Sequence, residues 1–387
     1  MGGLSTSACP GCGEKVSPED GFCEACGRDL SAITVSVGEP GHVAACPVCG
    51  SRVGTDGYCE ECGRKAPSGR DHVELDNGML AGITDRGLRH RRNEDAMAIA
   101  AAETPAGPAA VAVVCDGVST SARADEAALA AVEAAARALV ASLRAETSSR
   151  DAEREAEPDA EPQAEPEAEP QAEREAEREA ASAAAVRAAN DAVVGLAVPA
   201  DDPPSATYVS AVATNDAVTV CWVGDSRVYW LPAGSRAGAR QLTRDDSMAE
   251  ELTADGSLSA SEALASPQAH VITRWLGADV GELVPHVMTL RPTEPGVVLL
   301  CSDGLWNYRP EAADLASLAL PAAFTDPLAA AASLVTCALD AGGRDNITVV
   351  LIPVPLGRRT AAAGARDGAP GHRAAATSQV KPRSASP

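Results

Sequence analysis

Four aspartates stand at the ends of apolar stretches, a pattern that could assemble a metal site. The aspartates are Asp116, Asp225, Asp303 and Asp345, and the stretches that carry them are 110–117, 218–225, 297–304 and 345–352. A lone aspartate at such a point is usually a turn residue, but four in one pattern suggest a single cluster. Crowded carboxylates repel one another, and hard cations such as Mg²⁺ or Mn²⁺ take oxygen ligands and neutralise them. The residues therefore predict a carboxylate-bridged metal centre.

The elements that must position these aspartates are buried strands. Short apolar runs bounded by turn residues are typical of strands in the core, so each carboxylate would lie where a strand leaves the core. Helices are expected at about 124–144, 180–196, 311–318 and 327–341. Aromatic residues make up only 3% of the chain, so Val, Leu, Ile and Ala must build the core. Interleaved strands and helices alone would also allow a parallel α/β sheet.

Five short motifs extend this pattern along the chain. They are Asn93-Glu94-Asp95, Asp116-Gly117, Gly224-Asp225-Ser226-Arg227, Ser302-Asp303-Gly304 and Asp345-Asn346-Ile347-Thr348. In this order they resemble the metal-dependent type 2C (PPM) serine/threonine protein phosphatases, from about 80 to 354 with one insertion. The resemblance implies an α+β fold, a four-layer α/β/β/α sandwich of two antiparallel sheets flanked by helices. It also implies an enzyme that hydrolyses phosphoserine and phosphothreonine in proteins.

The resemblance implies a role for each predicted metal ligand. Asp116 would bridge two Mn²⁺ or Mg²⁺ ions. The other protein ligands would be the Gly117 carbonyl, Asp303 and Asp345, and Asp225 would help Asp303 to hold a third, weaker ion. Because a water between two cations loses its proton near neutral pH, a hydroxide bridging the ions would attack phosphorus in line, without a phosphoenzyme.

Beside the metal ligands, the resemblance assigns catalytic roles to one loop. Glu94 and Asp95 would orient the metal-bound waters. The family has an arginine that grips the substrate phosphate five residues before Asp95, but this chain has His90 there. Arg89 or Arg91 would substitute if the loop shifts; otherwise the phosphate grip is weaker. His90 and a metal-bound water are the candidates for protonating the leaving oxygen.

Two further departures from the family keep a rival interpretation open. Residues 118–122 read VSTSA where the family commonly continues with glycines, and Asp246 stands where the family's Leu-Thr-x-Asp-His-Ser segment has histidine. The rival is a catalytically weak, phosphatase-like scaffold that binds phosphoproteins and is recruited through the N-terminal cysteines. His90, Asp246 and the missing glycines favour the scaffold. The complete set of metal ligands favours the active phosphatase.

Eight cysteines in the first 62 residues form two pairs of CxxC motifs. They are Cys9, Cys12, Cys23 and Cys26 in the first pair and Cys46, Cys49, Cys59 and Cys62 in the second. Two CxxC knuckles complete the tetrahedron of a structural Zn²⁺, so two such ions are expected. The segment is similar to tandem zinc ribbons, whose closed sites suit recruitment of a protein partner better than catalysis. Because apolar residues are few, metal binding would supply most of its folding free energy.

Shifts in composition divide the chain into parts. The expected parts are a double zinc ribbon at 1–66, a linker at 67–78, a phosphatase-like domain at 79–356 and a disordered tail at 357–387. Within the domain, 146–180 is an acidic, low-complexity insertion of Glu, Ala and Pro, expected to be extended or partly helical. The insertion could repel acidic substrates or bind a basic partner, but a tolerated loop is the simpler interpretation.

Charge and hydropathy narrow the range of partners. The formal net charge of −23 over 387 residues argues against a general nucleic-acid binder. We find no uninterrupted apolar run of the ~18 residues that a membrane helix needs, and no N-terminal signal segment. The expectation is a cytoplasmic protein that acts on phosphorylated Ser/Thr proteins, with an unknown protein partner for the ribbons.

Overall fold

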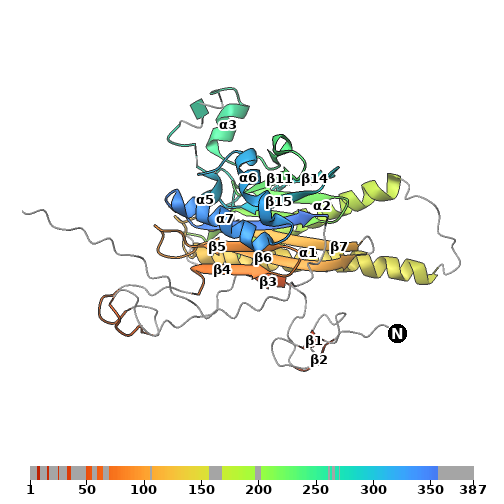
Figure 1. Ribbon diagram of the computed structural model, residues 1–387, viewed down its shortest axis with the longest axis horizontal. Coiled ribbons are helices and arrows are strands. Elements are labelled where there is room, and N and C mark those ends of the chain that lie inside the picture. The colour runs from red at the N-terminus through yellow and green to blue at the C-terminus, as the bar shows by residue number, and fades with distance from the viewer. Residues whose placement is uncertain are drawn as a thin grey trace, which may run out of the picture.

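Two six-stranded sheets form the centre of the structure, which is a computed structural model (Figure 1). The first sheet has the order β14 (His286–Leu290), β10 (Val218–Val223), β9 (Tyr208–Ala213), β7 (Gly107–Asp116), β6 (Asp95–Thr104) and β3 (Ile33–Val35). The second has the order β12 (Arg240–Gln241), β11 (Arg227–Pro232), β15 (Gly296–Cys301), β16 (Ile347–Val354), β5 (Ala81–Asp85) and β4 (His72–Asp76). Every pairing within these sheets is antiparallel, so the parallel alternative is wrong for the described strands.

The description covers the two central sheets and part of the N-terminal segment. The structure describes residues 7–8, 15–16, 25, 33–35, 49–54, 59–63, 69–104, 107–156, 168–196, 202–259, 262–263, 266–269 and 271–355. Two further small sheets pair β1 (Ser7–Ala8) with β2 (Lys15–Val16) and β8 (Ser205–Ala206) with β13 (Leu276–Gly277). The predicted zinc ligands Cys9, Cys12, Cys23, Cys26 and Cys46 and the predicted tail at 357–387 lie outside the described residues.

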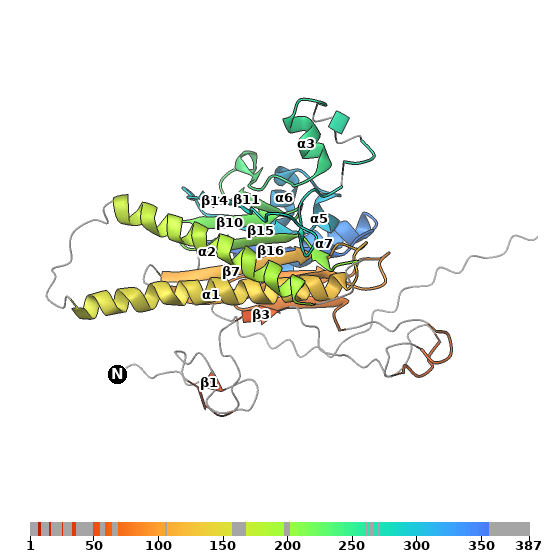
Figure 2. The same ribbon diagram turned by 180° about the vertical axis from the view of Figure 1, so that it is seen from behind.

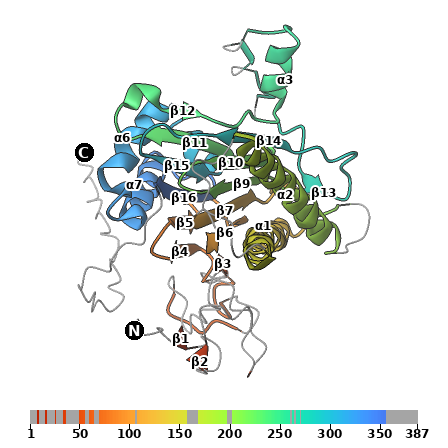
Figure 3. The ribbon, with the colours of Figure 1, turned by 90° about the vertical axis from the view of Figure 1, so that its right-hand side faces the viewer.

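Helices cover both outer faces of the stacked sheets. The helices with described bounds are α1 (Ala124–Ala156), α2 (Ala168–Val194), η1 (Arg236–Gly238), α3 (Met248–Ala254), α5 (Asp303–Trp306), α6 (Ala312–Ala323) and α7 (Pro327–Asp340). Figure 2 shows α1 and α2 running along the first sheet, and Figure 3 shows α6 and α7 on the far side of the second; α3 projects away from the sheets (Figure 3). The order helix, sheet, sheet, helix confirms the predicted four-layer fold. None of the helices in the described ranges combines the length and apolarity that a membrane crossing requires.

Alternation along the strands explains how each sheet is buried on both faces. In β6, Met97 and Ile99 belong to the core between the sheets, whereas Ala98 and Ala100 belong to the core beneath α1 and α2. Successive side chains of a strand point to opposite faces, and here both faces are covered. The sequence therefore reads as continuous apolar runs rather than as alternating ones. The small alanines on the helix side let α1 lie close to the sheet.

The structure contains more regular elements than the sequence predicts. Strand β4 lies inside the predicted linker at 67–78 and pairs with β5. Strand β3 lies between the two CxxC pairs and adds an edge strand to the first sheet by pairing with β6. Helix α1 continues to Ala156 and α2 begins at Ala168, so both helices extend into the predicted insertion at 146–180. Short strands and helix extensions of this kind depend on a tertiary partner that the local sequence does not reveal.

Candidate metal centre and active site

The strand ends bring the predicted carboxylates together from both sheets. Asp116 ends β7 and pairs directly across the sheet with Asp95, which begins β6. Asp303 begins α5, two residues after the end of β15, and Asp345 lies two residues before the start of β16. Asp225 lies in the turn between β10 and β11. The negative charges of the other four aspartates all act on Asp116, so the five carboxylates lie near enough to one another to interact.

Asp95 connects the two sheets within this cluster. The residue is only 2% exposed, and its Oδ2 accepts hydrogen bonds from the Ser302 and Thr348 hydroxyls, each at 2.7 Å. Its Oδ1 is buried and accepts from no donor among the described residues, and the carboxyl groups of Asp95 and Asp116 lie close enough to interact directly. Two ionised carboxylates lie this close only with a proton or a cation between them. Sequence reasoning missed Ser302 and Thr348 as holders of Asp95, although both lie inside the recognised motifs.

Burial and mutual repulsion set the protonation of the cluster. Burial raises the pKa of Asp116 and that of Asp303 well above the usual range, and the charges of neighbouring aspartates raise both further. Burial also raises the pKa of Asp225 to about 7 and that of Asp95 to about 6. A divalent cation would oppose these shifts because it favours the ionised carboxylate. This donor set, made of oxygen atoms alone, fits Mg²⁺ or Mn²⁺.

Gly117 occupies a position where no side chain fits. Its N–H donates to the Glu94 carbonyl oxygen at 3.2 Å. A Cβ atom at this residue would lie 2.5 Å from the Ala124 carbonyl oxygen and 2.7 Å from that of Glu94. Glycine is therefore required directly after Asp116, and it keeps the main chain beside the carboxylates.

His90 lies at the edge of the cluster, in contact with a predicted metal ligand. Its Nε2 is 3.1 Å from Asp345 Oδ1, and its Nδ1 is 4.0 Å from Glu94 Oε2. The flanking Arg89 and Arg91 are exposed and make no ion pair among the described residues. Arg92 is not available in the same way, because its Nε donates to Glu94 Oε1 at 2.8 Å. Within the described part of the chain, two guanidinium groups without an ion pair therefore flank the histidine.

Asn346 fixes the loop that carries His90. Its Oδ1 accepts from the Glu94 N–H at 2.8 Å, and its Nδ2 donates to the carbonyl oxygens of Arg86 and Arg92 at 2.8 and 3.1 Å. The residue is 2% exposed. In the sequence Asn346 stands out only as part of a motif, and its position directly after Asp345 is the available signal. One side chain thus ties the arginine-rich loop to the end of the second sheet.

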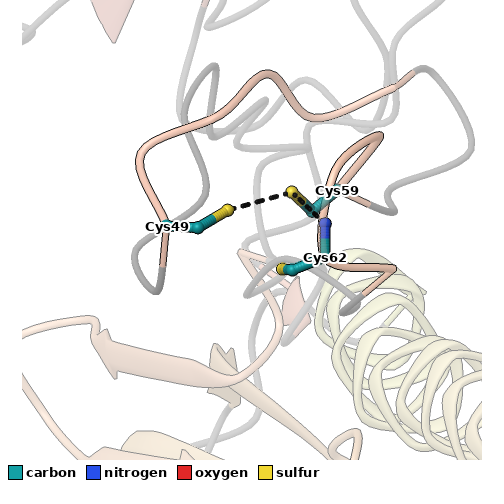
Figure 4. A group of neighbouring side chains, drawn as sticks. All are labelled: Cys49, Cys59 and Cys62. Carbon is teal, nitrogen blue, oxygen red and sulfur yellow. Dashed lines mark hydrogen bonds between the residues drawn. The ribbon is translucent and has the colours of Figure 1, made fainter.

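Three of the predicted zinc ligands lie together in the N-terminal segment (Figure 4). The sulfur atoms of Cys49, Cys59 and Cys62 all lie within 4.8 Å of one another, and the Cys49 and Cys59 sulfurs are 3.4 Å apart. The Cys62 N–H donates to Cys59 Sγ at 3.4 Å, as expected within a CxxC knuckle. Hydrogen bonds from Ser51 lower the pKa of the Cys49 thiol to about 6, which favours the thiolate that zinc binds.

Two family models match the chain. Residues 86–337 match the model described as Protein phosphatase 2C, and residues 9–67 match the model described as Double zinc ribbon. Because the first match spans more than half of the chain, the chain belongs to the protein phosphatase 2C family. Phosphatases of this family use Mn²⁺ or Mg²⁺, in agreement with the donor set at the strand ends.

Curated relatives match over part of their length. The serine/threonine phosphatase stp of Listeria innocua is 34% identical over 146 residues, which cover 38% of this chain and 55% of that protein. The protein phosphatase PhpP of Streptococcus pneumoniae is 36% identical over 146 residues, 37% of this chain and 55% of that protein. The serine/threonine protein phosphatase PstP of Mycobacterium tuberculosis is 35% identical over 133 residues, 34% of this chain and 24% of that protein. The chain spans about half the length of the first two.

Solved structures of bacterial phosphatases share the fold. The serine/threonine phosphatase of S. agalactiae is 24% identical, with a TM-score of 0.51 over 71% of this chain and 98% of that chain. The serine/threonine phosphatase Stp1 of Staphylococcus aureus is 23% identical, with a TM-score of 0.53 over 73% of this chain and 98% of that chain. At these identities the likeness concerns the fold alone.

Proposed function

We propose that this chain hydrolyses phosphoserine and phosphothreonine in proteins with the help of two Mn²⁺ or Mg²⁺ ions. The observation that carries the proposal is the set of aspartates from both sheets whose negative charges help to raise the pKa of Asp116 and that of Asp303. Membership of the 2C family and the names of the relatives support it. Phosphorylated proteins are then the substrates.

The proposed ligands follow from the placement of the side chains. Asp116 would bridge the two ions, and the Gly117 carbonyl, Asp303 and Asp345 would complete the protein ligands. Asp225 would hold a third, weaker ion together with Asp303. When bound, such ions acidify a water that lies between them to hydroxide and neutralise charge on the phosphoryl oxygens.

The chain's own groups would organise the reacting water and its surroundings. Glu94 is 6% exposed and accepts from Arg92 and from the Ser119 hydroxyl, the latter at 2.6 Å. These two donors fix the carboxylate as an acceptor for waters of the centre. Asp95 has one oxygen held by Ser302 and Thr348, and its carboxyl group interacts with that of Asp116, so it would orient the metal-bound waters and the Asp116 carboxylate.

Phosphate recognition would differ from the family pattern. His90 replaces the expected arginine and contacts Asp345, so its ring is held at the metal centre. We assign the phosphate grip to Arg89 and Arg91, whose guanidinium groups are exposed beside it. A guanidinium matches phosphate through two parallel hydrogen bonds, which an imidazole lacks. His90 then remains a candidate donor of the proton to the leaving oxygen.

The test is hydrolysis of a phosphothreonine peptide by the full chain. Turnover is expected with Mn²⁺, and its loss is expected with EDTA and in Asp303→Asn. Asp216→Asn is the matched control, because Asp216 is exposed in the turn between β9 and β10, at the opposite ends of those strands. Mn²⁺ binding without turnover would overturn the proposal and leave the phosphoprotein-binding scaffold.

The N-terminal segment is proposed to hold two structural Zn²⁺ ions and to recruit a protein partner. The eight ligands would be Cys9, Cys12, Cys23 and Cys26 at one site and Cys46, Cys49, Cys59 and Cys62 at the other. The closely spaced sulfurs of the last three support the second site. Elemental analysis of the purified chain is expected to give two zinc ions per molecule, and a value near zero would contradict the proposal.

A further inference from the structure

Two successive aspartates hold the turn that carries Asp225. Arg227 donates to Asp245 through Nε at 3.0 Å and through Nη2 at 2.7 Å. The Gly224 N–H donates to Asp246 Oδ2 at 3.0 Å. Asp225, a proposed ligand of the third ion, stands between Gly224 and Arg227 in sequence. The two aspartates therefore fix the turn on both sides of that ligand.

The contact between Asp246 and Gly224 is reciprocal. The Asp246 N–H donates to the Gly224 carbonyl oxygen at 2.9 Å, while its carboxylate accepts from the Gly224 N–H. Gly224 has φ +103°, and a Cβ there would lie 2.9 Å from Thr207, so this conformation requires glycine. Asp246 therefore holds the Gly224 backbone at both its N–H and its carbonyl oxygen.

His286 holds the Asp246 carboxylate in turn. Its Nε2 lies 2.8 Å from Asp246 Oδ1, and its ring stacks on Trp222, the residue paired with it across β10 and β14, with centroids 5.0 Å apart. A carboxylate oxygen only accepts, so this contact is a hydrogen bond in the tautomer whose Nε2 carries the hydrogen, and Arg274 Nη1 also lies 3.2 Å from Nε2. Arg274 Nε lies 3.7 Å from the same oxygen and adds a positive charge. Asp246 is 7% exposed, so its carboxylate interacts with these protein groups rather than with bulk solvent.

The opposite side of Asp225 is held independently. The Trp306 Nε1–H donates to the Asp225 carbonyl oxygen at 2.9 Å, and the Arg227 guanidinium lies 3.7 Å above the Trp306 ring. The main chain of Asp225 is therefore fixed from the α5 side by tryptophan and from the β14 side by the chain His286, Asp246 and Gly224. Removing Asp246 frees one side only.

We propose that Asp246, held by His286, is a positioning residue that sets the direction of the Asp225 carboxylate at the metal centre. This inference rests on the proposed metal centre. It accounts for the aspartate at position 246, where the family has a histidine, because His286 of β14 lies opposite and pairs with the Asp246 carboxylate. Asp246 touches neither metal nor substrate; it acts through Gly224.

The experiment measures Mn²⁺ binding to the full chain by equilibrium dialysis, which reads the metal centre without activity. Asp225→Asn identifies the Mn²⁺ equivalent that depends on Asp225. Asp246→Ala is expected to weaken that same equivalent about tenfold and to leave the tighter equivalents unchanged. His286→Ala is expected to weaken it less, about threefold, because the Gly224 hydrogen bonds survive.

The exchange variant Asp246→His with His286→Asp provides a rescue. It restores an acid and a histidine facing each other, so it is expected to bind Mn²⁺ within about twofold of the wild type while Asp246→His alone does not. Glu250→Gln is the matched control, because this α3 carboxylate pairs with Arg244 in the same segment and does not touch the turn. Asp246→Asn removes the negative charge but keeps the side-chain shape, so it replaces Asp246→Ala in the same measurement if the alanine variant does not fold.

The outcomes separate the inference from the proposed function. An unchanged Mn²⁺ isotherm in folded Asp246→Ala would overturn the positioning role. Weakening of all Mn²⁺ equivalents alike, with no rescue by the exchange variant, would also overturn it, because a general loss of structure would then be the cause. If the wild type bound no Mn²⁺, the metal centre would fail and the inference with it. If it bound Mn²⁺ as expected but hydrolysed no phosphopeptide, only the proposed function would fail.

Discussion

The carboxylate cluster and the cysteine cluster both bring together potential metal ligands, but they differ in what holds those ligands in place. Asp116, Asp303 and Asp345 sit at the ends of strands that are buried on both faces, and their positions are fixed by sheet register. Cys49 and Cys62 are exposed, and the bridge between Val53 and Cys59 is the local strand-like contact. Among the described residues only the cysteine sulfurs fall within 4.8 Å of one another as a group of three. In the body of the protein, meaning the two central sheets and their helices, sheet register would fix the backbone at the carboxylates without ions, whereas at the exposed cysteines an ion would hold the chain.

The strongest test of this contrast is the removal of zinc. A structural Zn²⁺ contributes on the order of 10 kcal/mol to the folding of a small ribbon. A zinc chelator is therefore expected to abolish amide protection at 49–63 in hydrogen exchange while the body keeps its unfolding temperature. Cys59→Ser should reproduce the loss, and Cys337→Ser, a free cysteine of α7, should not. Unfolding of the body together with the ribbon would break the comparison.

Loss of a carboxylate should have the opposite character. Asp116→Asn is expected to reduce kcat/KM at least about 10²-fold, because electrostatic stabilisation of the transition state typically contributes that much. The fold should persist, since the core that places Asp116 does not depend on the ion. Phosphopeptide kinetics and thermal unfolding, measured on the same preparation, check the two halves separately. A variant that retained activity would contradict the assignment of the bridging ligand.

Two glycines provide a matched comparison of packing. In Gly304→Ala the new Cβ would lie 1.9 Å from the Asn346 carbonyl oxygen, and such overpacking is expected to cost about 3 kcal/mol. Gly63 has φ +66°, and a Cβ added there would meet no atom of the described residues within 4 Å, so Gly63→Ala is expected to cost the left-handed strain of about 1 kcal/mol. Denaturant unfolding measures the first and competition for zinc the second. Equal costs would mean that the two regions are packed alike.

The smallest expected effect is the pH dependence of the metal-free body. The folded-state pKa of Asp225 is raised to about 7 and that of Asp95 to about 6, above the unfolded value of about 4. The folded state then binds more protons, so stability is expected to fall as pH rises from about 4 through about 7. In EDTA the unfolding temperature should be higher at pH 5.5 than at pH 7.5, by about 3 °C per kcal/mol.

Removing one of these acids should reduce that slope. Asp225→Asn in EDTA is expected to unfold at a more nearly constant temperature over the same pH range, because the raised carboxylate is gone. The exposed Asp216→Asn variant should behave as the wild type. A metal-free protein that became more stable with rising pH would show that repulsion at the cluster does not control its pH dependence.

Part of the fold was predictable because its signals are local. Apolar runs such as 110–117 and 297–304 indicate the central strands, and the order of the motifs implies the four-layer architecture through the family that it resembles. Strand β3 was not predictable, since three residues between two CxxC pairs become a strand only by pairing with β6. Strand β4 lies in a segment whose composition is typical of a linker, and it too becomes a strand only through its partner. Edge strands depend on such a partner, and here the partner of β3 is distant in sequence.

The candidate site divides in the same way. The residue types of the acidic cluster and of the cysteine pairs could be predicted from the sequence, because each kind of metal selects its donor atoms. Each of these ligands also lies at a strand end or in a CxxC knuckle. The partners that hold those ligands could not be predicted from the sequence. Asp95 is held by Thr348, 253 residues away, and Asp246 by His286, 40 residues away.

The sequence by itself determined which residues could bind metal and which segments would be buried, because donor chemistry and hydropathy are properties of short stretches. Tertiary structure alone decided that Asp116 faces Asp95 across two strands and that Asn346 fixes the arginine-rich loop. It also decided that a histidine from β14 holds the aspartate beneath the Asp225 turn. Those contacts follow from the register and stacking of the two sheets, where side chains far apart in sequence come within hydrogen-bonding distance.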